Sequence, residues 1–187
     1  MRLRTVVEHL NAAATMTCWH THMVPLFLQT SDYMRAVLHA SSTASGDELE
    51  ARVQARLAMQ ELLQNVVKST FVIHELALRL MVGGAEVQSA QVLHLMFMAN
   101  RQNITVRIVP AANGAHAGLA GPFTRLTFAK YEPLIWVETE NSSLFAEADA
   151  AIEGYERVIR ALDDDALDVD ASKELMVRLY ENLCVNY

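Results

Sequence analysis

The sequence is poor in cysteine, glycine and proline. Its 187 residues include two cysteines, seven glycines and four prolines. Cys18 and Cys184 lie near opposite ends, a spacing that predicts neither a disulfide framework nor a metal cluster and is typical of a reducing cytoplasm. So little glycine and proline excludes a collagen-like or low-complexity chain and argues against extended disorder.

Basic residues and long apolar runs are also scarce. Fifteen lysines and arginines stand against 22 acidic residues, which gives a net charge of −7. Outside Arg2 and Arg4 the basic residues do not cluster, so the chain is a poor candidate for nucleic-acid binding. Glu8, His9 and Asn11 interrupt the apolar core that a signal peptide needs, and no apolar run is long enough to span a bilayer. We therefore expect a cytoplasmic protein that binds neither nucleic acid nor membrane.

The remaining composition is that of a globular domain. Hydrophobic residues make up 52% of the chain, and a chain of 187 residues can bury a core without a disulfide or a metal. We expect one domain over residues 1–187, with a helical N-terminal part (1–68), a strand-rich middle (69–140) and a helical C-terminal part (141–187). Apolar residues at helical spacing predict helices over residues 3–18, 31–40, 46–68, 75–81, 86–101, 145–162 and 171–183.

β-branched and aromatic residues predict the strands. They are enriched over residues 70–74, 104–110, 123–129 and 134–138. The order of these segments predicts an α+β fold with a small mixed or antiparallel sheet of about four strands, helices on one face, and helical N- and C-terminal segments. Because side chains alternate along a strand, Arg107, Trp136 and Glu138 share one face if the register permits. That mixed face is either solvated or the lining of a pocket.

Several motifs resemble those of a known family. Residues 24–30 (VPLFLQT), followed by Tyr33 and residues 35–37, resemble the VPGLLQT…Y.RAV motif of an actinobacterial domain family of unknown function. This sequence departs from the usual family pattern at Leu26, which replaces glycine, and at Met59, which replaces arginine. Further stretches match in the same order at residues 55–60, 71–75, 78–79, 91–95, 103–110, 114–118, 121–123 and 137–138.

The resemblance carries an expectation about function. In that family the domain usually follows the helix-turn-helix of antitoxin-like transcriptional regulators of the xenobiotic-response-element type. This chain starts almost at the first helix of the domain, so we expect a stand-alone domain without a DNA-binding segment. The resemblance implies a sensory or partner-binding role and brings no catalytic residues with it.

The segment around Trp19 contains potential metal ligands. Zinc needs three or four convergent ligands, and Cys18, His20 and His22 would need help from elsewhere in the chain. We therefore predict no metal site. The segment is either a helix end packed on the core or part of an apolar pocket rimmed by Trp19 and His22, and we favour the pocket.

Two other histidines lie near predicted strand ends. His74 precedes Glu75, whose carboxylate could cap the next helix or pair with Arg79 four residues later. His116 lies in the glycine-flanked loop 113–121, which lacks the residues of a phosphate-binding loop. The loop is either a tight connection between strands or a lid that places His116 over the mixed face.

These observations define a candidate site. A cation, a large ring and a carboxylate on one face could bind a ligand with a polar head and an apolar body, or could form a solvated ion pair that contributes little. We expect the mixed face, roofed by the loop around His116, to enclose a chamber for a compact organic molecule. The candidates for ligand binding are Trp19, His22, Arg107, Phe123 and Trp136, and the candidates for acid–base catalysis are His74, His116 and Glu138.

Three functions remain open. The first is a stand-alone domain that binds a small organic ligand. The second is a cofactor-independent biosynthetic enzyme, a cyclase or isomerase that uses a shaped apolar pocket with one or two acid–base groups. The third is a protein-binding module of the antitoxin type or a homodimer. No flavin, nicotinamide or nucleotide motif is found, so we expect no cofactor.

Overall fold

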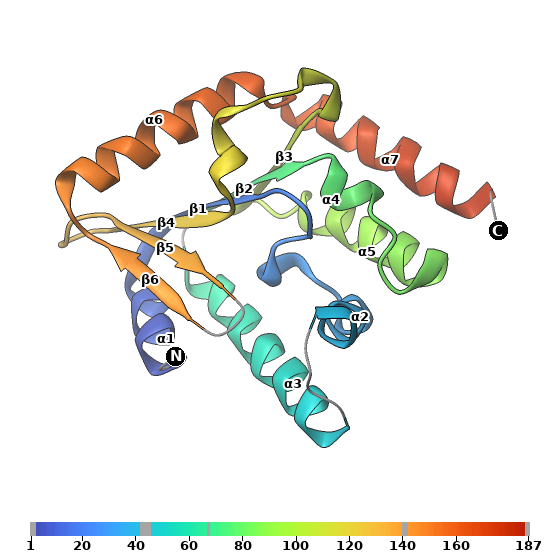
Figure 1. The fold of residues 1–187 in the computed structure, drawn as a ribbon, viewed down its shortest axis with the longest axis horizontal. Coiled ribbons are helices and arrows are strands. Elements are labelled where there is room, and N and C mark those ends of the chain that lie inside the picture. The colour runs from blue at the N-terminus through green and yellow to red at the C-terminus, as the bar shows by residue number, and fades with distance from the viewer. Residues whose placement is uncertain (1–2, 42–45, 67, 140–141, 186–187) are drawn as a thin grey trace.

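A mixed β-sheet forms the centre of the computed structural model, which describes residues 3–41, 46–66, 68–139 and 142–185 (Figure 1). Within these residues the sheet has six strands in the order β3-β2-β1-β4-β5-β6. The first three run parallel to one another, and the other pairs are antiparallel. The strands are β1 (Ala13–His20), β2 (Lys68–His74), β3 (Ile104–Val109), β4 (Phe123–Phe128), β5 (Leu134–Glu138) and β6 (Ser143–Ala146).

Helices cover both faces of this sheet (Figure 1). On one face lies α6, together with the short helix η4, and on the other lie α1, α3, α5 and α7. The α-helices are α1 (Leu3–Ala12), α2 (Ser31–Ser41), α3 (Asp47–Glu61), α4 (Leu76–Arg79), α5 (Gly84–Met98), α6 (Asp149–Asp165) and α7 (Val169–Val185). The short 3-10 helices are η1 (Leu26–Leu28), η2 (Leu62–Asn65), η3 (Ala111–Asn113) and η4 (Ala117–Ala120).

The register of the strands decides which side chains share a face. Trp19 of β1 lies opposite Val72 of β2 and Phe123 of β4, and Val72 in turn lies opposite Arg107 of β3. This row packs beneath α6, where Ile152 and other apolar residues complete a core. The alternate residues of each strand point to the opposite face and form the larger core with α1, α3, α5 and α7.

The predicted α+β class and four of the strands are confirmed, but the sheet is larger than about four strands and carries helices on both faces, not on one. The predicted helix over residues 3–18 is wrong beyond Ala12, because Ala13–His20 forms β1 in the middle of the sheet. The prediction that a helix begins at residue 145 is also wrong, because Ser143–Ala146 forms β6 and α6 begins at Asp149. Most of the connector predicted over residues 41–46 lies outside the described residues.

No helix in the described ranges has the length and the apolar character that crossing a bilayer requires.

Candidate functional site

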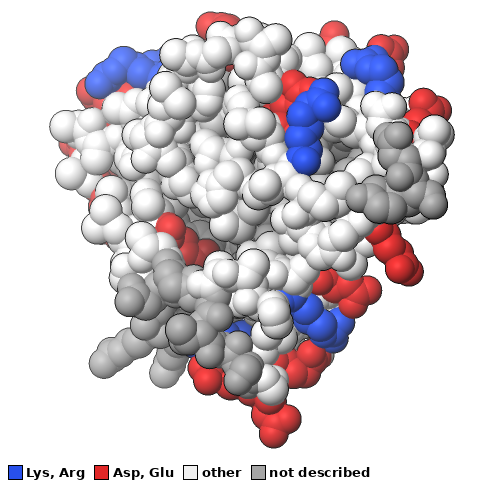
Figure 2. Space-filling model, turned by 45° about the vertical axis from the view of Figure 1, so that its right-hand side comes forward, with Lys and Arg blue, Asp and Glu red and all other residues white. Residues whose placement is uncertain are grey.

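A cavity of about 820 Å³ opens on the face of the sheet opposite α6. This volume is in the range of pockets that bind small organic molecules. Strands β1, β4 and β5 form its floor, and residues from α3, from the β1–η1 segment and from the β5–β6 connection form its walls and mouth. The face of the molecule drawn in Figure 2 is hollowed near its centre, and most of the surface around the hollow is uncharged.

The floor of the cavity is uncharged. Cys18, Thr124 and Trp136 lie opposite one another on three neighbouring strands, and all three line the cavity. The Cys18 thiol and the Thr124 hydroxyl are hydrogen-bonded at 3.3 Å, and the indole N–H of Trp136 donates to Ser143 Oγ at 3.1 Å. Burial raises the pKa of Cys18 to about 12, despite the hydrogen bond with Thr124, so the thiol stays protonated and does not act as a nucleophile.

One face of α3 forms a wall of the cavity. Arg52, Ala55, Arg56 and Met59 line it, and their spacing of three and four residues places them on one side of a helix. The two arginines lie at the N-terminal part of this stripe, and Met59 is buried deeper in the core. The wall therefore changes from charged to apolar along the helix.

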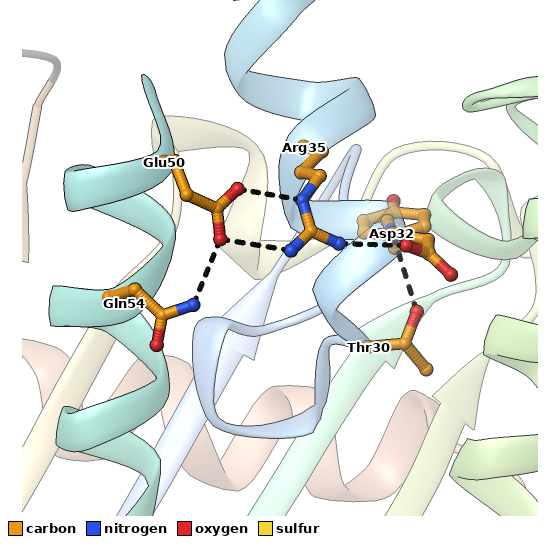
Figure 3. A network of polar contacts seen from close by, with 6 residues as sticks. Thr30, Asp32, Arg35, Glu50 and Gln54 are labelled. Atoms are coloured by element: carbon orange, nitrogen blue, oxygen red, sulfur yellow. Dashed lines mark hydrogen bonds and ion pairs between the residues drawn. The ribbon is translucent and has the colours of Figure 1, made fainter. Parts of the chain in front are cut away.

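A polar network joins this wall to α2 (Figure 3). The Arg35 guanidinium donates from Nε and Nη2 to the two carboxylate oxygens of Glu50 at 2.9 and 3.0 Å, and from Nη1 to Asp32 at 2.9 Å. Gln54 donates to Glu50 at 2.9 Å. The hydrogen bonds from Arg35 and Gln54 lower the pKa of Glu50 to about 2, so the pair stays charged at neutral pH. This paired geometry links α3 to α2 through two side chains that are about half exposed.

Side-chain amides hold the backbone of the opposite wall. Gln60 of α3 donates to the carbonyl oxygens of Leu26 and Gln29 at 2.7 and 2.8 Å, and Gln91 of α5 accepts from the Thr30 N–H at 2.7 Å. Each of these residues lies in a stretch that resembles the family motifs. Their side chains satisfy backbone groups of a segment that has little regular structure of its own. The motif residues therefore shape the cavity.

Two departures from the family-like pattern meet in the same place. Leu26 and Met59 both line the cavity, and both are apolar where the usual residues are glycine and arginine. Relative to that pattern, Leu26 adds an apolar side chain to the cavity lining and Met59 puts an uncharged side chain where a charged one is usual.

His20 is the second titratable side chain of β1 that lines the cavity. It follows Cys18 by two residues on the same face of β1, and its ring lines the cavity. Burial, with a smaller contribution from the neighbouring His22, lowers its pKa to about 4, so the imidazole is neutral at pH 7. His22 lies at the mouth, where its Nδ1 pairs with the Thr21 hydroxyl at 2.9 Å.

The predicted site residues fall into two groups on opposite faces of the sheet. His22, Trp136 and Glu138 line the cavity. Phe123 borders the cavity at the start of β4, but its ring packs against Tyr155 of α6 on the opposite face. Trp19, His74, Arg107 and His116 lie on the α6 face.

The aromatic cluster on the α6 face is closely packed. The His74 and His116 rings stack with centroids 5.0 Å apart, and the Trp19 ring stands edge-on to His116 at 5.1 Å. Trp19 donates from Nε1 to the Gly118 carbonyl oxygen at 2.9 Å, which fixes the loop around His116 on this face. The loop therefore does not roof the cavity. His74 and His116 cannot act on the same bound molecule as Glu138.

Arg107 does not share a face with Trp136 and Glu138, and this expectation is wrong. Its guanidinium lies at the C-terminal end of α6, where it donates to the carbonyl oxygens of Ala166 and Leu167 at 2.7 and 2.8 Å and pairs with the Asp163 carboxylate. Arg107 thus satisfies the orphan carbonyls of a helix end and joins β3 to the α6–α7 connection.

His74 and Glu75 bind local groups. The predicted pair between Glu75 and Arg79 is confirmed, with Nε donating to Oε1 at 2.7 Å, and the other carboxylate oxygen accepts from the Ala111 N–H at 2.8 Å. His74 Nδ1 accepts from the Leu76 N–H at 3.2 Å, and burial lowers the pKa of His74. Glu75 thus joins the end of β2 to the segment after β3, and His74 satisfies a backbone N–H at the start of α4.

Sequence reasoning missed the importance of His20, Gln60 and Gln91. His20 was considered only as a metal ligand, although its spacing from Cys18 places the two residues on one face once the segment is known to be a strand. The glutamines gave no chemical signal, because their role depends on which backbone segment lies beside them. Among the described residues, no group of three or more His, Cys, Asp and Glu side chains is placed to hold a metal ion.

Comparisons with known proteins identify a family but no characterised relative. Neither the curated proteins nor the solved structures contain a match to this chain. A family model described as a domain of unknown function, DUF5753, matches residues 3–178, nearly the whole chain. The protein whose cavity is described above is therefore a member of the DUF5753 family.

Proposed function

We propose that this chain is a binding domain for a small organic molecule, which it holds in the cavity between the sheet and α3. The observation that carries the proposal is the cavity itself, with about 820 Å³ of space over an uncharged floor whose Cys18 and Thr124 groups are hydrogen-bonded to each other, and with charged side chains at one end of the α3 wall and at the mouth. Pockets of this size and character bury most of the surface of a drug-sized ligand.

The construction of the walls supports the same role. Hydrogen bonds with Gln60 and Gln91 hold the η1 segment, and the Arg35–Glu50 pair links α3 to α2. A cavity whose walls are held before the ligand arrives loses less conformational entropy on binding. These contacts are what a preformed site needs, and they involve the residues that make up the family-like motifs.

The proposal extends to the context that the motifs imply. We infer that the chain acts in the cytoplasm as a counterpart of the sensor domain in actinobacterial antitoxin-like regulators, and that those domains have a cavity in the same position. Catalysis, dimerisation and binding of a partner protein stay predictions.

Filling the cavity provides the test. N-phenyl-1-naphthylamine, an uncharged dye that fluoresces in apolar surroundings, should bind to the wild-type chain with saturation at one dye per chain. Ala55→Trp places an indole in the cavity and should weaken this binding at least about fivefold, because the added ring removes space and apolar contacts from the ligand.

Ala58→Trp is the matched control, because Ala58 lies three residues later on the exposed side of the same helix. It should leave dye affinity unchanged, and circular dichroism should show both variants folded. Equal affinity in wild type, Ala55→Trp and Ala58→Trp would place the dye outside the cavity and refute the proposed function.

A further inference from the structure

We propose that the ligand of this cavity is an uncharged, largely apolar molecule whose hydroxyl or amino group hydrogen-bonds to the imidazole of His20. The inference rests on the proposed function and adds to it the chemical class of the ligand and the residue that recognises its polar end.

His20 is the polar side chain of the cavity floor that protein contacts leave unsatisfied. Thr124 is hydrogen-bonded to Cys18, and the Trp136 N–H is bonded to Ser143. No other described residue hydrogen-bonds to His20, and neither of its ring nitrogens is sealed from the cavity by protein atoms. The ring nitrogens are therefore open to whatever fills the cavity, and a ligand that displaces water from them must supply a hydrogen bond in its place.

Gln29 offers a weaker alternative. Its Oε1 also has no partner among the described residues, but protein atoms cover that oxygen, while its Nε2 donates to the Val24 carbonyl at 2.7 Å. A ligand in the cavity would reach His20 without moving the wall, whereas reaching Gln29 Oε1 would require the wall to open.

The charge state of His20 favours a neutral ligand. With a pKa of about 4, the ring carries a proton in only about one molecule in a thousand at pH 7. A neutral imidazole has one N–H donor and one acceptor nitrogen, which suits a hydroxyl or amine better than a carboxylate or a phosphate. The charges at the mouth are of both signs, with Arg52 and Arg56 on α3 and Glu138 at the end of β5, so they select neither a cation nor an anion.

The test compares two probes of nearly identical shape. N-phenyl-1-naphthylamine has an N–H donor, and 1-benzylnaphthalene has in its place a methylene group, which neither donates nor accepts a hydrogen bond. A hydrogen bond worth about 1 kcal/mol corresponds to about a fivefold difference in affinity. The wild-type chain should therefore bind the amine about fivefold more tightly than the hydrocarbon, with the hydrocarbon measured by displacement of the dye.

Variants of His20 assign this preference to the imidazole. His20→Phe keeps a ring of similar size without nitrogen atoms and should bring the ratio of the two affinities close to one by weakening the amine alone. His20→Gln retains a hydrogen-bonding group and should keep part of the preference. His39→Phe changes an exposed histidine on α2 that does not line the cavity, and it should behave as the wild type does.

The outcomes separate the two proposals. If the wild type binds both probes with equal affinity, or if His20→Phe keeps the preference, the hydrogen bond to His20 is refuted while the cavity still binds ligands. If neither probe binds to the wild type, the proposed function fails and this inference fails with it. If His20→Phe does not fold, the ratio of the two affinities in the wild type and in His20→Gln tests the inference. A ratio close to one in the wild type, or an undiminished preference in His20→Gln, refutes the hydrogen bond to His20.

Discussion

Gly118 should not tolerate a side chain, because its backbone lies directly against the Trp19 ring. A Cβ atom at Gly118 would lie 2.3 Å from Trp19 Nε1 and 2.4 Å from Cε2. Trp19 is only 1% exposed and is held between the sheet, His116 and α6, so the ring cannot move aside. Overpacking of a core costs about 1–3 kcal/mol, and separating the buried indole N–H from the Gly118 carbonyl adds about 1 kcal/mol or more.

We therefore expect Gly118→Ala to lower the free energy of unfolding by about 2–4 kcal/mol, as measured by urea denaturation followed by circular dichroism. In a double-mutant cycle with Trp19→Phe, part of this loss should be recovered, because the smaller ring leaves room for the methyl group.

Gly154→Ala is the control, since a Cβ there meets only the end of the Arg157 side chain at 3.9 Å. Gly154 lies within α6, where alanine is the better helix former, so this change should raise stability by up to about 1 kcal/mol. If Gly118→Ala unfolds within about 0.5 kcal/mol of the wild type, the packing described for the loop on the α6 face is incorrect.

Three further predictions follow from the two faces of the sheet. The folded-state pKa of His20, about 4, lies below its unfolded value of 6.5, so the contribution of neutral His20 to stability is present above pH 6.5 and is lost as the pH falls toward 4. Between pH 7 and 4.5 the free energy of unfolding of the wild type should therefore fall by about 2 kcal/mol more than that of His20→Phe. An equal fall in both proteins would contradict this. Arg107→Leu should lower the free energy of unfolding by about 1–3 kcal/mol, because it removes the hydrogen bonds to the end of α6. Dye affinity should stay unchanged, because Arg107 lies on the other face of the sheet from the cavity. A change in dye affinity would contradict that placement. Ellman's reagent should modify exposed Cys184 in the native chain and reach buried Cys18 only after denaturation, so rapid modification of both thiols would be inconsistent with the burial of Cys18.

The strands that the sequence predicted are those with the clearest local pattern. β3, β4 and β5 are rich in β-branched and aromatic residues and are bounded by turns, so composition alone identifies them. The sequence does not predict β1 as a strand, because β1 lies in the middle of the sheet with residues buried on both faces. Its apolar residues also continue the helical spacing of α1. A segment of this kind lacks the alternation that distinguishes a half-buried strand from a helix.

For the candidate site, the sequence predicts correctly which residues of one strand share a face, but not which residues of different strands do. Trp136 and Glu138 share a face because side chains alternate along one strand, and both line the cavity. Arg107 was assigned to the same face, but its side depends on the register between β3, β2 and β1. A shift of one residue in that register reverses every side chain, and composition does not determine it.

The walls of the cavity depend on contacts over long sequence separations. The Gln60 amide binds the η1 segment, which lies more than 30 residues earlier in the chain, and Gln91 binds the same segment from α5. The sequence pattern around a glutamine does not distinguish one on a solvated helix from one that satisfies a buried backbone group. The stretches that resemble the family motifs include both glutamines, but only the packing explains why glutamines stand at these positions.

The methionine methyl groups provide the most direct test of the cavity as a binding site. Met23 and Met59 line it, whereas Met81 belongs to an exposed apolar surface and Met176 is buried beside α5. In chain labelled with ¹³C at the methionine methyl groups, N-phenyl-1-naphthylamine should shift the signals of Met23 and Met59 through the ring currents of the bound dye and leave those of Met81 and Met176 in place. Unchanged Met23 and Met59 signals at saturating dye, with a shift at Met81 in their place, would contradict the assignment of the cavity as the binding site.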